Sequence, residues 1–185
     1  MSNPSKRKKD VLYDFEPKHL LHIHRQLFLY GPINEQVGNS IKQNLIAFDI
    51  VSKQPITLWL SSPGGSCSAG LSIIEIIRKI ESPVITIINS EVCSIASMIS
   101  VVGDVRWAFS TSTWMQHPMA SGQGVEYLNF IKDRTAFLAR YNEILVKILK
   151  EHTKLSPSDY KKIDNGELWL NADEMKAKGI IDQII

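Results

Sequence analysis

The chain has 185 residues, a net charge of +2 and 44% hydrophobic residues, which are ordinary values for one soluble domain. The balanced charge argues against nucleic acid as an obligate partner. No uncharged apolar run reaches the roughly 18 residues that a membrane span needs, which argues against a membrane protein.

A polar N-terminal segment precedes the first predicted element. It carries four consecutive basic residues, from Lys6 to Lys9, and no apolar signal core follows them. Such a run is typical of a solvated tail, so we expect residues 1–18 to be a flexible basic tail and residues 19–185 to form a single domain. The absence of a signal segment predicts a cytoplasmic protein.

Short apolar runs then alternate with segments of helical spacing. The predicted strands are residues 26–31, 56–62, 84–89, 105–109 and 113–117. Helices are predicted after Asn34, which is a suitable N-cap, and over residues 66–80. This order of elements predicts an α/β fold of largely parallel strands covered by helices.

One long helix is predicted from Val125 to about His152, with apolar side chains along one face. At 1.5 Å per residue it would be roughly 40 Å long. One small domain does not need a helix of that length. We therefore expect part of it to project and to pack against another subunit.

Three features carry the residue types of nucleophilic catalysis. Ser97 follows a predicted strand at the start of a helix, Gly64 and Gly65 follow another strand, and His117 ends a third. A serine nucleophile needs a base and backbone N–H donors for the oxyanion, and the carboxyl ends of parallel strands meet at one edge. Spacing alone nevertheless favours a packing role for Ser97, because a G-x-S-x-G elbow is absent.

The neighbouring serines and the two cysteines have simpler interpretations. Ser94 is expected to cap the helix and Ser100 to bond back to the preceding turn. Cys67 and Cys93 lie in apolar or small-residue surroundings, so we expect reduced thiols and no metal site. The SPGGS segment lacks the lysine of a phosphate-binding loop, and no cofactor is expected.

The chain resembles the proteolytic subunit of the Clp protease, ClpP, over about residues 27–184. The motifs that carry the resemblance are LFLYGPI, SSPGGSCSAG at 61–70, ASM at 96–98, RWAFSTSTWMQHP at 106–118 and ELWLNADEMKAKGIID at 167–182. The resemblance implies a ClpP/crotonase-like fold and a serine endopeptidase. It also implies a homo-oligomer of two stacked heptameric rings, a tetradecamer that receives unfolded polypeptide from an AAA+ unfoldase.

The resemblance also assigns roles to single residues. It makes Ser97 the nucleophile, His117 the general base and Glu167 the acid, in place of the family's aspartate. Two alternatives stay open for the acid: that Asp164 nearby takes this role, or that the chain has lost the acid. The resemblance makes the N–H groups of Gly65 and Met98 the oxyanion hole. The segment predicted to pair with extended substrate is Ala120, Ser121, Gly122, Gln123 and Gly124.

The chain departs from the family pattern close to Ser97. Cys93 and Ile99 stand where the family usually has glycine, and the glutamine that usually follows the catalytic histidine is missing after His117. Two other hypotheses therefore stay open. The chain could be a ring subunit that has lost catalysis, or an acyl-CoA enzyme of the related crotonase fold.

Overall fold

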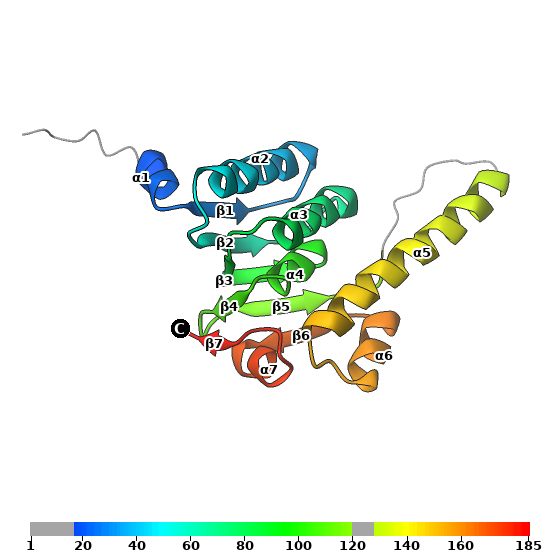
Figure 1. The fold of residues 1–185 in the computed structure, drawn as a ribbon. Coiled ribbons are helices and arrows are strands. Elements are labelled where there is room, and N and C mark those ends of the chain that lie inside the picture. Colours follow the sequence, from blue (N-terminus) through cyan, green and yellow to red (C-terminus); the bar gives the residue numbers. More distant parts are fainter. Residues whose placement is uncertain (1–16, 120–127) are drawn as a thin grey trace, which may run out of the picture.

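A seven-stranded, mostly parallel sheet organises the computed structural model, which describes residues 17–119 and 128–185 (Figure 1). The helices are α1 (Pro17–Ile23), α2 (Glu35–Val51), α3 (Cys67–Lys79), α4 (Ile95–Ser100), α5 (Leu128–His152), α6 (Pro157–Asn165) and α7 (Ala172–Ala177). The strands are β1 (Gln26–Tyr30), β2 (Ile56–Ser62), β3 (Val84–Cys93), β4 (Val105–Ala108), β5 (Thr113–Gln116), β6 (Leu168–Asn171) and β7 (Gln183–Ile184). The predicted tail, residues 1–18, lies almost entirely outside the described residues.

The sheet runs in the order β1-β2-β3-β4-β7, and all of these neighbours pair in parallel. Strand β3 is long enough to have two partners on one side. Its residues 85–88 pair with β4, and its residues 91–93 pair with β5. β5 then pairs antiparallel with β6. The predicted α/β class with a largely parallel sheet is confirmed.

The predicted strands lie at the expected places, but four of the five end at a different residue, and β1 and β4 end one residue earlier than predicted, at Tyr30 and Ala108. The strand predicted over residues 84–89 continues to Cys93, because its polar end, including Ser90 and Glu91, pairs with β5. The strand predicted over residues 113–117 ends at Gln116, so His117 is the first residue beyond it. Sequence patterns did not reveal α1, α6, α7, β6 or β7, which are short elements fixed by tertiary packing.

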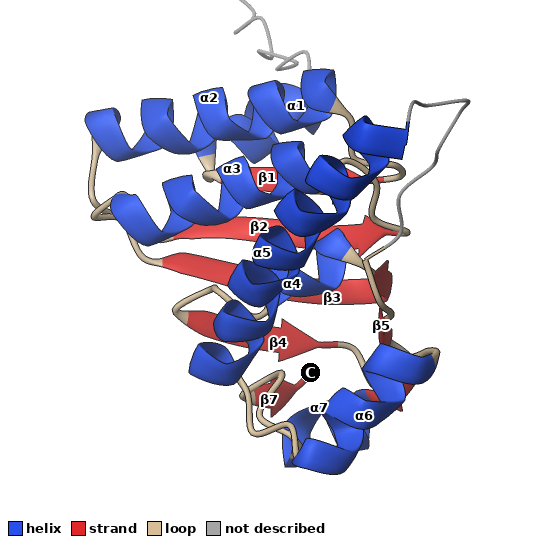
Figure 2. Cartoon of the chain, turned by 90° about the vertical axis from the view of Figure 1, so that its right-hand side faces the viewer, coloured by secondary structure: helices blue, strands red, loops and turns tan. Residues whose placement is uncertain are grey.

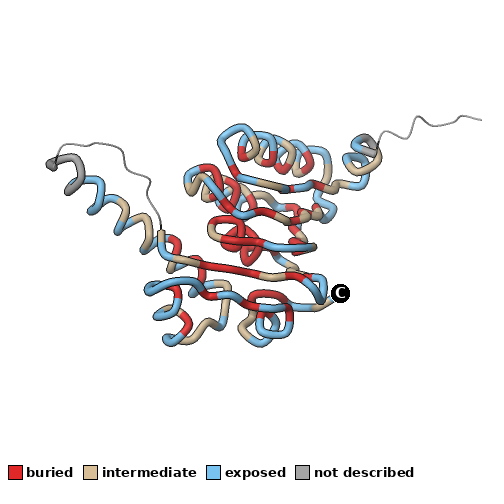
Figure 3. The backbone as a smooth tube through the Cα atoms, turned by 180° about the vertical axis from the view of Figure 1, so that it is seen from behind, coloured by how far each residue is buried: buried red, intermediate tan, exposed pale blue. Residues whose placement is uncertain are grey.

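Helices α2, α3, α4 and α5 lie in front of the strands in Figure 2. Every residue of α4 is buried, and the core continues through the inward side chains of β2 and β3 (Figure 3). Leu58, Leu60 and Ile88 are among the side chains with 1% exposure or less. Burying each such side chain stabilises the fold by roughly 1.5–3 kcal/mol, so the strand positions are firmly specified.

Helix α5 projects away from the sheet, as the sequence predicts (Figure 1). Its C-terminal half is anchored through Leu145, Ile148 and Leu149, which are buried. On the other face of this half, Ile144 is 48% exposed, and farther out Phe137 is 59% exposed. None of the helices in the described segments is long and apolar enough to cross a membrane.

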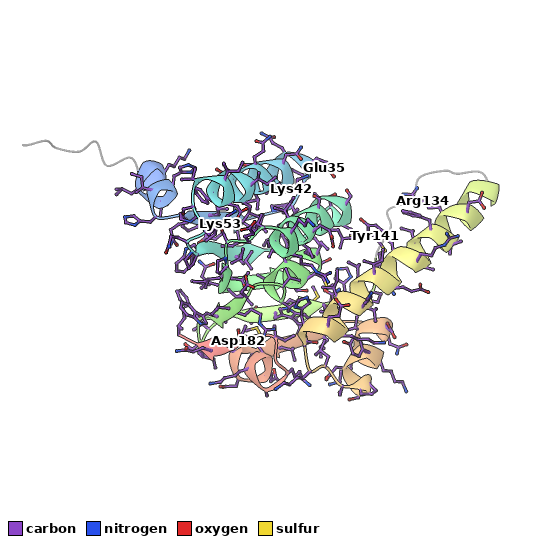
Figure 4. All side chains as sticks on the ribbon, in the orientation of Figure 1. Glu35, Lys42, Lys53, Arg134, Tyr141 and Asp182 are labelled. Carbon is purple, nitrogen blue, oxygen red and sulfur yellow. The ribbon has the colours of Figure 1, made fainter. Side chains whose placement is uncertain are left out.

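The C-terminal end of α5 is tied to the end of the chain by Arg106 on β4. Its guanidinium donates to the carbonyl oxygens of His152 (2.7 Å) and Gly179 (2.9 Å), and to Asp182 Oδ1 (2.6 Å). Asp182 lies on the lower part of the domain in Figure 4, close to β7. Arg106 therefore fixes the base from which α5 projects.

A buried carboxylate, Asp159, joins α6 to Lys178, the C-cap residue of α7. It forms a capping box with Ser156, and it accepts hydrogen bonds from Lys178 Nζ at 2.9 and 2.8 Å. Burial alone would raise the pKa of Asp159, but the hydrogen bonds from Lys178 and Ser156 outweigh it and lower the pKa to about 2. The charged form of Asp159 therefore stabilises the fold.

We expect Asp159→Asn to lower the free energy of unfolding by about 2 kcal/mol at pH 7. Because the folded-state pKa is depressed, this stabilisation is present above about pH 4 and is lost as the pH falls towards 2. Denaturant titrations of wild type and variant at pH 7 and pH 2.5 measure this difference in the free energy of unfolding. Asp133→Asn, at an exposed position on α5, is the matched control. If Asp159→Asn destabilised the protein equally at both pH values, the stabilising role of the charged Asp159 would be contradicted.

Candidate active site

The glycine turn after β2 forms one wall of the candidate site. Gly65 has φ +145°, and an added Cβ there would collide with the carbonyl oxygen of Ile33. The turn is held in place because Ile33 N donates to Gly64 O and Ser66 N donates to Ile33 O, both at 2.8 Å. The N–H of Gly65 has no acceptor within the described residues. It is thus an available backbone donor.

A second turn, at Ser94, connects β3 to α4. Ser94 has φ 56° and ψ −129°, an uncommon conformation for a residue other than glycine, and its N–H donates to Met115 O at 2.9 Å. Ser94 occupies the N-cap position of α4, but its side chain makes no capping hydrogen bond. The two turns touch, because a Cβ on Gly64 would lie 2.7 Å from Cys93 O and 2.8 Å from Ser94 Cβ.

Ser97 lies one turn into α4 and has no exposed surface. Its Oγ is 2.6 Å from Ser94 O and 2.7 Å from Gln116 Oε1. A hydroxyl carries one hydrogen, so it can donate to only one of these oxygens at a time. Ser100 Oγ donates to Ser97 O at 2.7 Å, which confirms the back-bonding expected for Ser100.

His117 follows β5 directly and is partly exposed. Its Nδ1 lies 2.5 Å from Pro118 O, the carbonyl of the next residue. Within the described part of the chain, no hydrogen bond joins Ser97 to His117. The serine and the histidine are close in the fold, but in this conformation each has a different partner.

Sheet register brings Glu167 beside His117. β5 and β6 pair Met115 with Trp169 and Gln116 with Leu168, so the next pair in this register would be His117 and Glu167. Glu167 is exposed, however, and its Oε2 accepts a hydrogen bond from Trp169 Nε1 at 2.8 Å. The register therefore predicts Glu167 opposite His117, but within the described residues no hydrogen bond joins the two side chains.

Two adjoining cavities meet at the end of β5. The first, of about 250 Å³, is lined by residues that include Gly65, Met98, Gln116 and His117. The second, of about 430 Å³, shares Gln116 and His117 with the first and extends between α5 and α6 as far as Asp164. The alternative acid named from the sequence thus shares a cavity with the histidine.

A backbone donor and the Cys67 thiol also line the first cavity, and Cys93 is buried at the end of β3 nearby. The N–H of Met98 is 3.4 Å from Ser94 O, a long hydrogen bond that leaves this donor weakly engaged. Burial raises the pKa of Cys93 to about 12, with further contributions from Glu91 and Glu167, and burial also raises the pKa of Cys67. Both thiols stay protonated at neutral pH, which makes a cysteine nucleophile unfavourable.

The described residues contain no group of three or more His, Cys, Asp or Glu side chains that could hold a metal ion. The predicted substrate-pairing segment, Ala120 to Gly124, lies outside the described residues. Sequence reasoning overlooked Gln116, the side-chain partner of Ser97. The sequence offered only a weak signal, the i, i+2 spacing that puts Gln116 on the same face of the strand as Trp114, because Met115 between them is buried as well.

Comparisons with known proteins show the family of the chain. The family model "Clp protease" matches residues 8–185. The ATP-dependent Clp protease proteolytic subunit 3 of Synechococcus sp. (strain CC9605) is 30% identical over 168 residues, which cover 89% of this chain and 84% of the relative. Proteolytic subunit 2 of Treponema denticola is 31% identical over 164 residues, covering 86% and 81%. Proteolytic subunit 3 of Rhizobium etli is 27% identical over 164 residues, covering 87% and 84%. The chain belongs to the Clp protease family.

Proposed function

We propose that this chain is a serine endopeptidase subunit that cleaves unfolded polypeptides, with Ser97 as its nucleophile. The observation that carries the proposal is the convergence of the glycine turn, α4 and His117 on one cavity. All three follow the carboxyl ends of strands in a largely parallel sheet, where ligands usually bind. Family membership favours peptide-bond hydrolysis over acyl-CoA chemistry on the same fold.

In this mechanism His117 takes the proton of Ser97 as Oγ attacks the peptide carbonyl carbon. The N–H groups of Gly65 and Met98 donate to the oxyanion of the tetrahedral intermediate. His117 then protonates the leaving amine, and a water molecule activated by the same histidine hydrolyses the acyl-enzyme. Glu167 orients His117 and stabilises its charged form.

Reaction requires two side chains to change partners. The Ser97 hydroxyl must donate to Nε2 of His117 in place of Ser94 O or Gln116 Oε1, and Nδ1 of His117 must exchange Pro118 O for Glu167. These are side-chain rotations and need no change in the sheet. The same hydrogen bonds support a second candidate function, a catalytically weak or inactive ring subunit with a structural role.

We further propose a homo-oligomer of two stacked heptameric rings in the cytoplasm, fed by an AAA+ unfoldase. The names of the relatives, ATP-dependent proteolytic subunits, support a partner that uses ATP. Large exposed apolar side chains support burial by neighbouring subunits. They include Phe137 and Ile144 on α5, 59% and 48% exposed, and Phe28 and Tyr30 on β1, 37% and 48% exposed.

We expect a fluorophosphonate probe to label the assembled protein on Ser97 alone. Ser97→Ala should abolish labelling, because it removes the nucleophilic oxygen. Ser100→Ala is the matched control and should keep it. Mass spectrometry of the labelled peptide and native mass measurement of the same sample provide the readouts. An assembled but unlabelled wild-type protein would favour the structural role.

Two isosteric variants identify the acid. We expect Glu167→Gln to lower kcat for a short peptide at least about 100-fold, because a neutral amide cannot stabilise the imidazolium. Asp164→Asn should leave kcat within about twofold of the wild-type value, since Asp164 would then be a residue of the second cavity wall without a catalytic role. The opposite pattern would make Asp164 the acid. No effect from either change would mean that His117 works without one.

Gly65→Ala tests the predicted oxyanion hole. An added Cβ would collide with Ile33 O and move the Gly65 N–H, so kcat/KM should fall about 100-fold. Gly166→Ala is the control, because a Cβ there would lie 4.0 Å from Lys162 O, its nearest neighbour. Peptide hydrolysis is measured together with circular dichroism. A folded Gly65→Ala protein with full activity would contradict the role of this donor.

A further inference from the structure

We propose that Gln116 is a positioning residue that holds the Ser97 hydroxyl in a resting orientation, so that Ser97 reacts only after this hydrogen bond breaks. The inference rests on the proposed peptidase function and adds a restraint on the reactivity of its nucleophile, Ser97. Gln116 takes no part in the proton transfers of the mechanism above.

The contact between the two side chains is short and buried. Ser97 Oγ is 2.7 Å from Gln116 Oε1, Ser97 has no exposed surface, and Gln116 is 7% exposed. The hydroxyl also lies 2.6 Å from Ser94 O. If the Gln116 amide is turned by 180°, its Nε2 donates to Oγ while the hydroxyl donates to Ser94 O. In either orientation Gln116 occupies a hydrogen-bonding position on the reactive oxygen.

The backbone fixes Gln116 on this side of the sheet. Gln116 pairs with Leu168 across the β5–β6 ladder, and Trp114, two residues earlier, is fully buried on the same face. Gln116 also lines both cavities, whereas Ser97 lines neither. The amide is therefore a cavity-lining side chain that contacts the hydroxyl, next to Ser94, which lines the first cavity and contacts the hydroxyl through its backbone oxygen. Substrate in the cavity would meet Gln116 before Ser97.

The chemistry of an amide explains why this contact restrains the serine. A glutamine side chain exchanges hydrogen bonds but takes no proton near neutral pH, so it cannot activate the hydroxyl as a histidine does. Attack requires the hydroxyl to donate to His117 instead. The observed rate of reaction of Ser97 is then its intrinsic rate multiplied by the fraction of molecules in which Gln116 has released the hydroxyl.

The test compares the wild-type oligomer with Gln116→Met, which keeps the length of the side chain and removes its hydrogen bond. We expect the second-order rate constant for labelling by a fluorophosphonate to rise about fivefold, the factor that one net hydrogen bond is worth. For a short peptide, kcat should rise by a similar factor with KM unchanged. The pH profile should keep its midpoint, because His117 remains the base. Gln116→Leu provides a second variant if methionine prevents folding.

Ser112→Ala is the matched control. Ser112 is also buried and donates one hydrogen bond, to Ile88 O at 2.7 Å, but it does not contact Ser97. Loss of this hydrogen bond in Ser112→Ala should destabilise the fold about as much as Gln116→Met does, and it should leave the labelling rate unchanged. A rise in both variants would reflect general loosening of the fold and would overturn the inference.

The outcomes separate this inference from the proposed function. Labelling of wild type and Gln116→Met at equal rates, or slower labelling of the variant, overturns the restraint and leaves the peptidase intact. If only the Gln116→Met variant is labelled, the restraint is supported, because the wild-type serine is then held in the resting orientation. If neither protein is labelled, the peptidase proposal fails, and the restraint fails with it because releasing the hydroxyl gave no reactive serine.

Discussion

The close approach of two turns is the constraint on which the candidate site depends. The turn after β2 and the turn after β3 meet where a Cβ on Gly64 would lie 2.7 Å from Cys93 O. No side chain fits in that space, so glycine allows the ends of two parallel strands to lie side by side. The next residue, Gly65, then presents its N–H close to the helix that carries Ser97. One missing side chain thus sets the distance between the candidate oxyanion donor and the candidate nucleophile.

The length of β3 gives the site its other half. A strand that ended at Asn89 would pair with β2 on one side and with β4 alone on the other, and β5 would have no parallel partner there. Because β3 continues to Cys93, it positions β5, and β5 in turn positions β6. The serine at the end of β3 and the histidine at the end of β5 are therefore placed by a single pair of neighbouring strands. The carboxylate of Glu167 arrives from the opposite direction, because β6 is antiparallel.

Sequence patterns predicted the elements that bury apolar side chains and missed those that depend on pairing. The runs at β1, β2 and the first part of β3 are apolar enough to be recognised alone, whereas Ser90 and Glu91 are polar and become strand only by pairing with β5. Strand β7 has two residues, too few for any period to show. At the site, Ser97 and His117 could be named from the order of motifs. The contact of Ser97 with Gln116 could not, because it joins residues 19 apart whose orientation only the folded sheet determines.

The departures from the family pattern beside Ser97 affect packing more than backbone geometry. In the described chain the non-glycine residues with positive φ are Arg25 and Ser94, so Cys93 replaces the usual glycine without backbone strain. Cys93 and Ile99 are 4% and 0% exposed, and their side chains fill the core around α4. Both side chains help to hold α4 in the core, so the mechanism we propose relies on rotation of the Ser97 side chain alone. In that proposal two residues adjacent in the chain, Gln116 with its amide and His117 with its imidazole, compete for the Ser97 hydroxyl.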